Sequence, residues 1–219
     1  MKYARPYVKR YWIFEHKKAL GLSFIVFAVV YSIGLMFTTI LNSFFLVNIT
    51  NIFTMALLLF ILAALVIIGS LVNAHNKSTH IMSKEEHAKH SKHVGIFFIL
   101  MILSSIGFLL PLIFDVYPGS LLLLFSAGGI LLLLYAFLIL IFDYKFYEIA
   151  IASIFLWAIF IFSVFFVAPI YYLNAPLFEA ISLLVSSVTL VTVFAVSGIV
   201  MLHSAANEFL NDFKIRNKI

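Results

Sequence analysis

Residues 120–142 read SLLLLFSAGGILLLLYAFLILIF, a continuous apolar run without a charged side chain. A helix needs about 20 such residues to cross the hydrocarbon core of a bilayer, and this run is long enough. Membrane strands instead alternate apolar and polar residues over roughly 10 positions, and the run shows no such alternation. The stretch therefore predicts a transmembrane helix.

Composition extends this prediction to the whole chain. Hydrophobic residues make up 64% of the 219 residues and charged residues only 11%, whereas about a quarter of the residues in a soluble domain are charged. Apolar runs of spanning length occur at 19–40, 53–72, 94–114, 120–142, 149–173 and 177–202. We therefore expect an all-α, polytopic integral membrane protein, with six transmembrane helices in a single membrane domain at 19–202.

Positively charged residues predict the orientation of these spans. All 14 Lys and Arg residues and all seven His residues fall on one side of the predicted membrane, in the N-terminal arm (1–18), the loop 73–93, the turn 143–148 and the C-terminal tail (203–219). Short segments rich in Lys and Arg stay on the cytoplasmic side. We therefore expect a multi-pass protein of the cell membrane with both termini in the cytoplasm.

The N-terminal arm carries aromatic side chains at helical spacing. The aromatic residues follow one another at intervals of four, four and three positions, so they share one helical face. They are Tyr3, Tyr7, Tyr11 and Phe14. Basic residues are dispersed around this face, and Pro6 limits a regular helix to the part that starts near it. The pattern predicts an interfacial amphipathic helix, which serves either as a membrane anchor or as a docking helix for a cytoplasmic partner.

A second helix is predicted to project on the same side. Ser83 and Glu86 have the spacing of a capping box, so a helix that begins at Lys84 can continue into the third span. Together with the arm it forms the predicted surface for lipid or partner subunits, which comprises Tyr7, Arg10, Tyr11, Trp12, Lys84, Lys89 and Lys92. We expect anionic lipid head groups there, and other membrane or cytoplasmic subunits at the arm and the loop 73–93. Topology accounts for the net charge of +5, so we expect no nucleic acid partner.

Histidines gather in the loop 73–93 and suggest a metal site. His87 and His90 lie three residues apart on the predicted helix, and with His80 they form the candidate ligand set. Neutral imidazoles bind zinc, nickel and copper. The chain has no Cys, however, and the interleaved lysines would repel a divalent ion. The alternative is a solvated, partly protonated basic loop.

The predicted membrane interior lacks the residues of intramembrane chemistry. No His lies within a span, and no Asp, Glu, Lys or Arg lies near a span centre, so haem ligation and proton relays have no candidate residues. Nucleophile motifs, phosphate-binding loops and dinucleotide fingerprints are also missing from the sequence. We therefore expect neither an enzyme nor a resident cofactor.

One polar feature remains in the sixth span. A helix turns by about 100° per residue, so five polar side chains of this span fall within an arc of roughly 80° on the helix surface. These residues are Glu179, Ser182, Ser186, Thr189 and Ser197. Hydroxyls at this spacing usually allow close helix packing, and the functional alternative is the wall of a polar path entered near Glu179. Small-residue helix contacts are likewise predicted at Gly128, Gly129, Ala28 and Ser32.

Three functions are compatible with these features. The first is a transport or permease-type component of a multi-protein membrane assembly, without its own catalytic centre. An amphipathic helix followed by six spans resembles the layout of small permeases of ATP-driven exporters. The second is a non-catalytic accessory subunit of a respiratory or other energy-converting membrane complex. The third is a metal-handling membrane protein that uses the His-rich loop.

Overall fold

The computed structural model of the chain describes residues 6–45, 65, 68–77, 84, 95, 99, 119–142, 144–167 and 169–216. Regular secondary structure in this part of the chain is entirely helical, as the sequence predicts. Four of its helical stretches are long and apolar enough to cross a membrane, at Lys9–Gly34, Leu121–Leu140, Tyr147–Leu173 and Ala175–Glu208. The predicted spans at 53–72 and 94–114 lie mostly outside the described residues.

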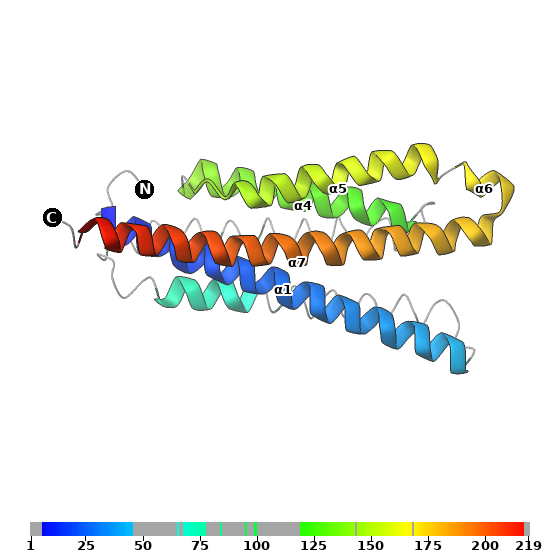
Figure 1. Cartoon of the computed structure of the whole chain (residues 1–219), viewed down its shortest axis with the longest axis horizontal. Helices are drawn as coiled ribbons and strands as arrows, with labels where there is room; N and C mark the ends of the chain where they lie inside the picture. The colour runs from blue at the N-terminus through cyan, green and yellow to red at the C-terminus, as the bar shows by residue number, and fades with distance from the viewer. Residues whose placement is uncertain are drawn as a thin grey trace. The chain divides into compact units, whose positions relative to one another are not determined.

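The first helix, α1 (Pro6–Phe45), joins the predicted N-terminal arm and the first predicted span into one element (Figure 1). It begins at Pro6 because the fixed φ of proline suits the first turn of a helix, where its missing N–H is not needed. The helix then crosses the predicted boundary between residues 18 and 19. No Pro or Gly separates residue 7 from residue 20, and extending a helix costs far less than nucleating one. Residues 6–18 of the arm are therefore the first part of α1 rather than a separate element.

The last helix, α7 (Ala175–Arg216), continues well past residue 202, where the sixth span was predicted to end. Most of the predicted C-terminal tail is thus helical, because no Pro or Gly interrupts the chain from residue 199 onward. The 42 residues of α7 extend roughly 63 Å and the 40 residues of α1 roughly 60 Å, at 1.5 Å per residue. Each helix is about twice as long as the hydrocarbon core is thick.

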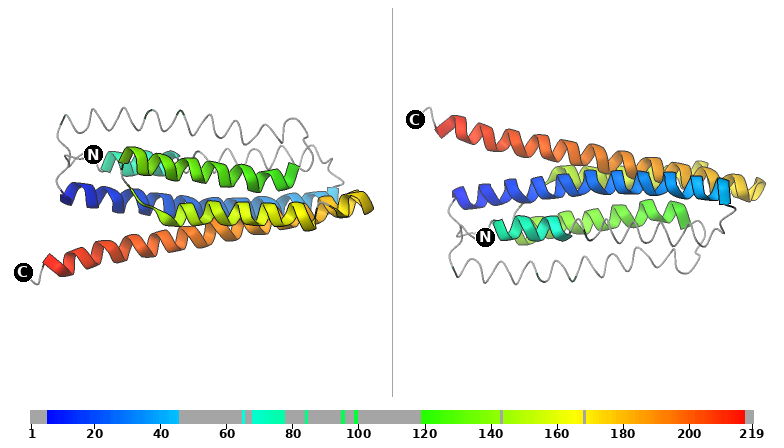
Figure 2. Two further views of the ribbon diagram at one scale, coloured as in Figure 1. Left: turned by 90° about the horizontal axis from the view of Figure 1, so that it is seen from above. Right: turned by 90° about the horizontal axis from the view of Figure 1, so that it is seen from below.

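Helices α4 (Gly119–Phe142) and α5 (Tyr147–Phe166) form an antiparallel hairpin and lie side by side in Figures 1 and 2. The bounds of α4 agree with the predicted span at 120–142 to within one residue. The span predicted at 149–173 is divided between α5 and the short helix α6 (Ile170–Leu173). Pro169 explains the division, because its nitrogen has no N–H to continue the helical hydrogen bonding and its ring clashes with the preceding helical turn.

Two compact units divide the chain. The first comprises Met1–Ala4 and Ser83–Val193, and the second comprises Arg5–Met82 and Phe194–Ile219. Helix α7 therefore contributes its N-terminal half to the first unit and its C-terminal half to the second. One core cluster of the first unit comprises Leu121, Val167 and Phe178, with Phe160, Ile170 and Ile181 packed against it.

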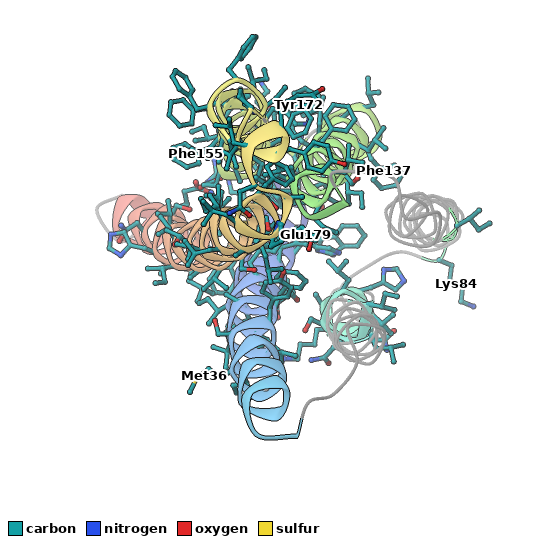
Figure 3. All side chains as sticks on the ribbon, turned by 90° about the vertical axis from the view of Figure 1, so that its right-hand side faces the viewer. Met36, Lys84, Phe137, Phe155, Tyr172 and Glu179 are labelled. Atoms are coloured by element: carbon teal, nitrogen blue, oxygen red, sulfur yellow. The ribbon has the colours of Figure 1, made fainter. Side chains whose placement is uncertain are left out.

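Large apolar side chains also cover the outward face of α5. They are strongly exposed and include Ile151, Ile154, Phe155, Ile161, Phe162 and Phe165. Figure 3 shows Phe155 projecting away from the helix. An exposed apolar face of this size is unfavourable in water and is typical of a surface that contacts lipid.

Candidate functional site

Polar and small residues at the helix contacts are the candidates for function. In the first unit α5 is hydrogen-bonded to α4 by side chains. Ser153 Oγ donates to the carbonyl oxygen of Gly128 over 2.6 Å, and Trp157 Nε1 donates to the carbonyl oxygen of Phe125 over 3.0 Å. A Cβ atom at Gly128 would lie 2.5 Å from Trp157 Cδ1, which is too close for any side chain.

These distances confirm Gly128 as a small-residue contact. A Cβ atom at Gly129 would meet no described atom within 4 Å, so the structure shows no helix contact at that glycine. On α1, Ala28 is buried, and Ser32 Oγ donates to the Ala28 carbonyl oxygen of its own helix over 2.7 Å. The Ser32 hydroxyl is therefore satisfied within α1.

The second unit contains a closer glycine contact, which sequence reasoning missed. A Cβ atom at Gly21 on α1 would lie 2.9 Å from the carbonyl oxygen of Gly198 on α7, and one at Gly198 would lie 2.6 Å from the carbonyl oxygen of Gly21. The two backbones approach this closely because neither residue has a side chain. Phe24 and Phe27 pack beside this contact, with ring centroids 5.1 Å and 4.5 Å from that of Phe194.

An ion pair joins the same two helices nearer the chain termini. Lys17 Nζ on α1 donates to Glu208 Oε1 on α7 over 2.9 Å. The Lys17 side chain is only 4% exposed, while that of Glu208 is 60% exposed. A buried ammonium group is tolerated when a carboxylate neutralises it. Lys17 belongs to the cations of the predicted N-terminal arm, and the sequence pattern did not reveal Glu208 as its partner.

Next to Lys17 lies a buried aromatic and imidazole pair. Trp12 is completely buried, and His16 is 8% exposed. The Trp12 and His16 ring centroids are 5.8 Å apart, and His16 Nδ1 lies 2.9 Å from the Trp12 carbonyl oxygen. His75, on the helical segment 68–77, lies near enough to interact electrostatically with His16. Together with Lys17, these residues form a polar cluster in the described part of the second unit.

Trp12 was predicted as part of the surface for lipid or partner subunits, but the structure buries it completely. A different periodicity explains the burial, because the inward face of α1 comprises Trp12, His16, Leu20, Ser23 and Phe27, at intervals of three or four residues. The other predicted surface residues divide into three groups. Arg10 and Lys84 are exposed, and Lys84 is labelled in Figure 3. Tyr11 is half-buried, and the Tyr7 side chain, Lys89 and Lys92 lie outside the described part.

The polar stripe of the sixth span does not present a uniform surface. Ser182 and Ser186 are buried, Thr189 and Ser197 are half-buried, and Glu179 is exposed. The buried hydroxyls donate within α7, Ser182 Oγ to the Glu179 carbonyl oxygen and Ser186 Oγ to the Leu183 carbonyl oxygen, each over 3.1 Å. Hydroxyls bonded in this way can be buried without a partner from another helix.

Two further buried hydroxyls were not singled out by the sequence. Ser163 on α5 and Ser187 on α7 are buried, and neither hydroxyl has a hydrogen-bond partner among the described residues. A serine becomes a nucleophile when a base accepts its hydroxyl proton, and neither hydroxyl is hydrogen-bonded to a base within the described residues. His203, the histidine that follows the sixth span, instead pairs with Asn207, with 2.9 Å between His203 Nε2 and Asn207 Nδ2.

The predicted metal ligands His80, His87 and His90 lie outside the described residues, so the metal site stays a prediction. Within the described ranges no group of three or more His, Cys, Asp or Glu side chains is placed to hold a metal ion.

The turn between α4 and α5 is a compact aromatic element. Tyr144 and Phe146 are buried and stack with ring centroids 5.7 Å apart. Burial raises the pKa of the Tyr144 hydroxyl above its usual range, so the phenol stays protonated. The Tyr144 N–H donates to the Leu138 carbonyl oxygen over 3.0 Å and thereby closes the end of α4. The turn is therefore a structural element of the hairpin.

Comparison of the chain with protein-family models, with curated proteins and with solved structures gave no match. The geometry thus provides the argument for function. It consists of apolar helices, close small-residue contacts, and a polar cluster where α1 and α7 meet near the chain termini.

Proposed function

We propose that the protein is a membrane-embedded subunit of a multi-protein assembly in the cell membrane, a transport or permease-type component whose catalytic centre lies in another subunit. In this proposal the chain crosses the membrane six times and both termini are cytoplasmic. The four apolar helical stretches and the exposed apolar face of α5 support the membrane location. The one-sided distribution of cations supports the orientation.

The proposal rests mainly on the N-terminal end of α1 and the C-terminal end of α7, which are paired. Relative to the predicted spans, α1 has 13 extra residues at its N-terminal end (6–18) and α7 has 14 at its C-terminal end (203–216). Each extension is about 20 Å long. The Lys17–Glu208 ion pair joins the extensions, which supports the proposal that both lie on the same side of the membrane. We call residues 6–18 and 203–216 the paired extension.

A pair of helices that projects from the membrane is better suited to binding a cytoplasmic partner subunit than to contacting lipid alone. A helix that lies in the interface keeps its rings at head-group depth, whereas Trp12 is completely buried. Lipid remains a second partner in the proposal, because Arg10 and Lys18 are exposed on α1 near the membrane and anionic head groups attract such cations. The loop 73–93 would add to the same contact surface.

A second candidate function is a non-catalytic accessory subunit of an energy-converting complex. The stripe favours it, because the buried Ser186 hydroxyl donates to the Leu183 carbonyl oxygen of its own helix. Transport predicts that Ser186→Val lowers flux while the assembly stays intact. A scaffold role predicts that the same variant changes subunit retention instead.

Copurification tests the proposal directly. The chain would be isolated from its native membranes in mild detergent, and the associated subunits identified by mass spectrometry. The double variant Arg10→Glu, Lys18→Glu should lose a cytoplasmic subunit at least about tenfold, because both charges are reversed on the exposed face of the extension. Lys145→Glu is the matched control, since Lys145 is an exposed cation of the α4–α5 turn. Isolation of the intact chain without any associated subunit contradicts the proposal.

A further inference from the structure

The short helix α6 carries the two most exposed large apolar side chains of the described residues. Tyr172 is 88% exposed and Leu173 is 86% exposed. Figure 3 views the first unit from the α6 end and labels Tyr172. The predicted fifth span at 149–173 contained both residues, but the division of that span at Pro169 separates them from α5. Their exposure therefore calls for a partner other than the rest of the described helices.

Contacts within the first unit hold α6 in place. The Tyr171 ring meets the ring of Phe178 edge to face, with centroids 5.9 Å apart, and Phe178 belongs to the buried core cluster. The Asn174 N–H donates to the Ile170 carbonyl oxygen over 2.8 Å, and Asn174 Oδ1 accepts the Leu177 N–H over 3.1 Å. These contacts tie α6 to α7 and to the core, so the two exposed side chains are held outward.

The length of α5 sets the depth at which α6 would lie in a bilayer. The 20 residues of α5 are about 30 Å long, which equals the thickness of the hydrocarbon core. A helix of this length that crosses the core ends where the hydrocarbon meets the head groups. Since α6 begins four residues after the end of α5, it falls at that boundary rather than inside the hydrocarbon.

Exposed apolar side chains continue along the chain from α5 through α6. Phe162 and Phe166 at the end of α5 stack with ring centroids 4.4 Å apart and are both exposed, as is Phe165 between them. Leu177, which follows α6 at the start of α7, is exposed as well. The α6 side chains therefore extend the apolar face of α5, whose character is typical of lipid contact.

The chemistry of this surface fits lipid of a particular kind. A tyrosine ring with its hydroxyl group is best accommodated where a membrane meets water. Residues 167–178 contain no charged side chain, so the surface lacks both the cations that attract anionic lipid and the charges that select a protein partner. The first charge after it is the exposed carboxylate of Glu179, which repels anionic head groups.

We propose that α6 is an interfacial anchor that binds the boundary between the head groups and the acyl chains of lipids without net negative charge. Tyr172 lies at head-group depth and Leu173 contacts the upper part of the acyl chains. In the proposed orientation this is the outer leaflet. The anchor rests on the membrane location in the proposed function, but it requires neither transport nor a partner subunit. It fixes the depth of the connection between α5 and α7 in the bilayer.

Spin-label accessibility tests the anchor on the full chain. The protein has no Cys, so one nitroxide can be attached specifically at Leu173→Cys on α6 or at Phe155→Cys near the middle of α5, both exposed positions. In phosphatidylcholine vesicles, collisions with oxygen report hydrocarbon and collisions with a water-soluble nickel chelate report water. The Phe155 position should show the oxygen-to-nickel ratio of the hydrocarbon. The Leu173 position should have a ratio at least about threefold lower, yet at least about threefold higher than a label in water, because interfacial helices insert about 5–10 Å.

A substitution at Tyr172, with the label at position 173, tests the contribution of the aromatic ring. Tyr172→Asp should raise the nickel collisions at least about threefold, because a carboxylate resists leaving water. Tyr172→Trp is the matched control and should leave them unchanged, since an indole ring also favours the interface. Replacing half of the lipid by phosphatidylglycerol should not move the label deeper, and a deeper label would overturn the proposed lipid class.

The two labelled positions separate failure of the anchor from failure of the proposed function. With the hydrocarbon ratio observed at position 155, a label at position 173 that is as accessible to nickel as in water overturns the anchor alone. A label at position 173 that is shielded from both oxygen and nickel also overturns it, because a protein surface then covers α6. Absence of the hydrocarbon ratio at position 155 contradicts the membrane location and the anchor with it. The labels at positions 155 and 173 retain Tyr172, so these outcomes decide the proposal even where Tyr172→Asp fails to fold.

Discussion

Lys17 on α1 and Glu208 on α7 are 191 residues apart in the chain and form an ion pair of 2.9 Å. Its asymmetry is informative, because the lysine is buried and the glutamate is largely exposed. The pair joins the two longest helices at the end where both extend past their predicted spans. It therefore links the stability of the second unit to the geometry of the paired extension.

Removal of the glutamate should destabilise the second unit. Glu208→Gln removes the carboxylate that contacts the buried Lys17 ammonium group, and we expect a loss of about 1–2 kcal/mol, less than for a fully buried pair because Glu208 faces solvent. Unfolding of the reconstituted protein by increasing detergent would measure the loss. Lys18→Gln, next to the pair but exposed, is the control and should change the stability by less than about 0.5 kcal/mol. The double variant Lys17→Met, Glu208→Leu should recover much of the loss, and a double variant as unstable as Glu208→Gln would argue against the pair.

The glycine contact between α1 and α7 should not accept a methyl group. A Cβ atom at Gly198 would lie 2.6 Å from a backbone oxygen, so Gly198→Ala must separate the helices and should cost about 1–3 kcal/mol. Gly129→Ala is the matched control, because no described atom crowds that position and alanine favours the helix by up to about 1 kcal/mol. Thermal unfolding of both variants in the same detergent gives the comparison. Equal stability of the two would disprove the close approach.

The α4–α5 hairpin should depend on the hydroxyl that crosses between its helices. Ser153→Ala removes the bond to the Gly128 carbonyl oxygen, and we expect a loss of about 0.6–1.7 kcal/mol. Ser126→Ala serves as the control, since Ser126 Oγ donates to Leu122 of its own helix. In a Trp12→Phe background, the emission of Trp157 would report on the hairpin. Equal shifts of the Trp157 emission in Ser153→Ala and Ser126→Ala would show that the bond from Ser153 to Gly128 stabilises the hairpin no more than a bond within one helix.

Zinc binding tests the metal-handling alternative. The interleaved lysines of the loop 73–93 oppose a divalent ion, so we expect the tag-free protein to bind zinc no more tightly than the variant in which His80, His87 and His90 are all replaced by Ala. Isothermal titration of the two purified proteins provides the measurement. If the native protein bound zinc at least about tenfold more tightly than the triple variant, metal handling would again be a candidate function.

Some contacts could be anticipated from residue type alone. Gly128 was expected to be a small-residue contact, and the structure places it against Ser153 and Trp157. Gly129, adjacent and identical, has no such contact. Adjacent residues on a helix point about 100° apart, so only the position of the neighbouring helix decides which of the two is crowded.

Trp12, His16 and Lys17 show the opposite case. All three belong to the N-terminal arm, which the sequence predicts to be a basic, aromatic helix at the membrane interface. The structure buries all three, because α1 is continuous and its inward face extends back to Trp12. Local pattern did not reveal Glu208, which lies on α7 and meets Lys17 only when the chain ends pair.

The sequence by itself determined the helical class and the presence of spans long enough for a membrane, because both depend on the length and hydropathy of contiguous runs. It also predicted the α4 helix almost to the residue. Only the tertiary structure decided which glycines touch and which cation is neutralised. Those features arise from contacts between residues far apart in the chain, and a periodic pattern carries information about one helix face but not about what packs against it.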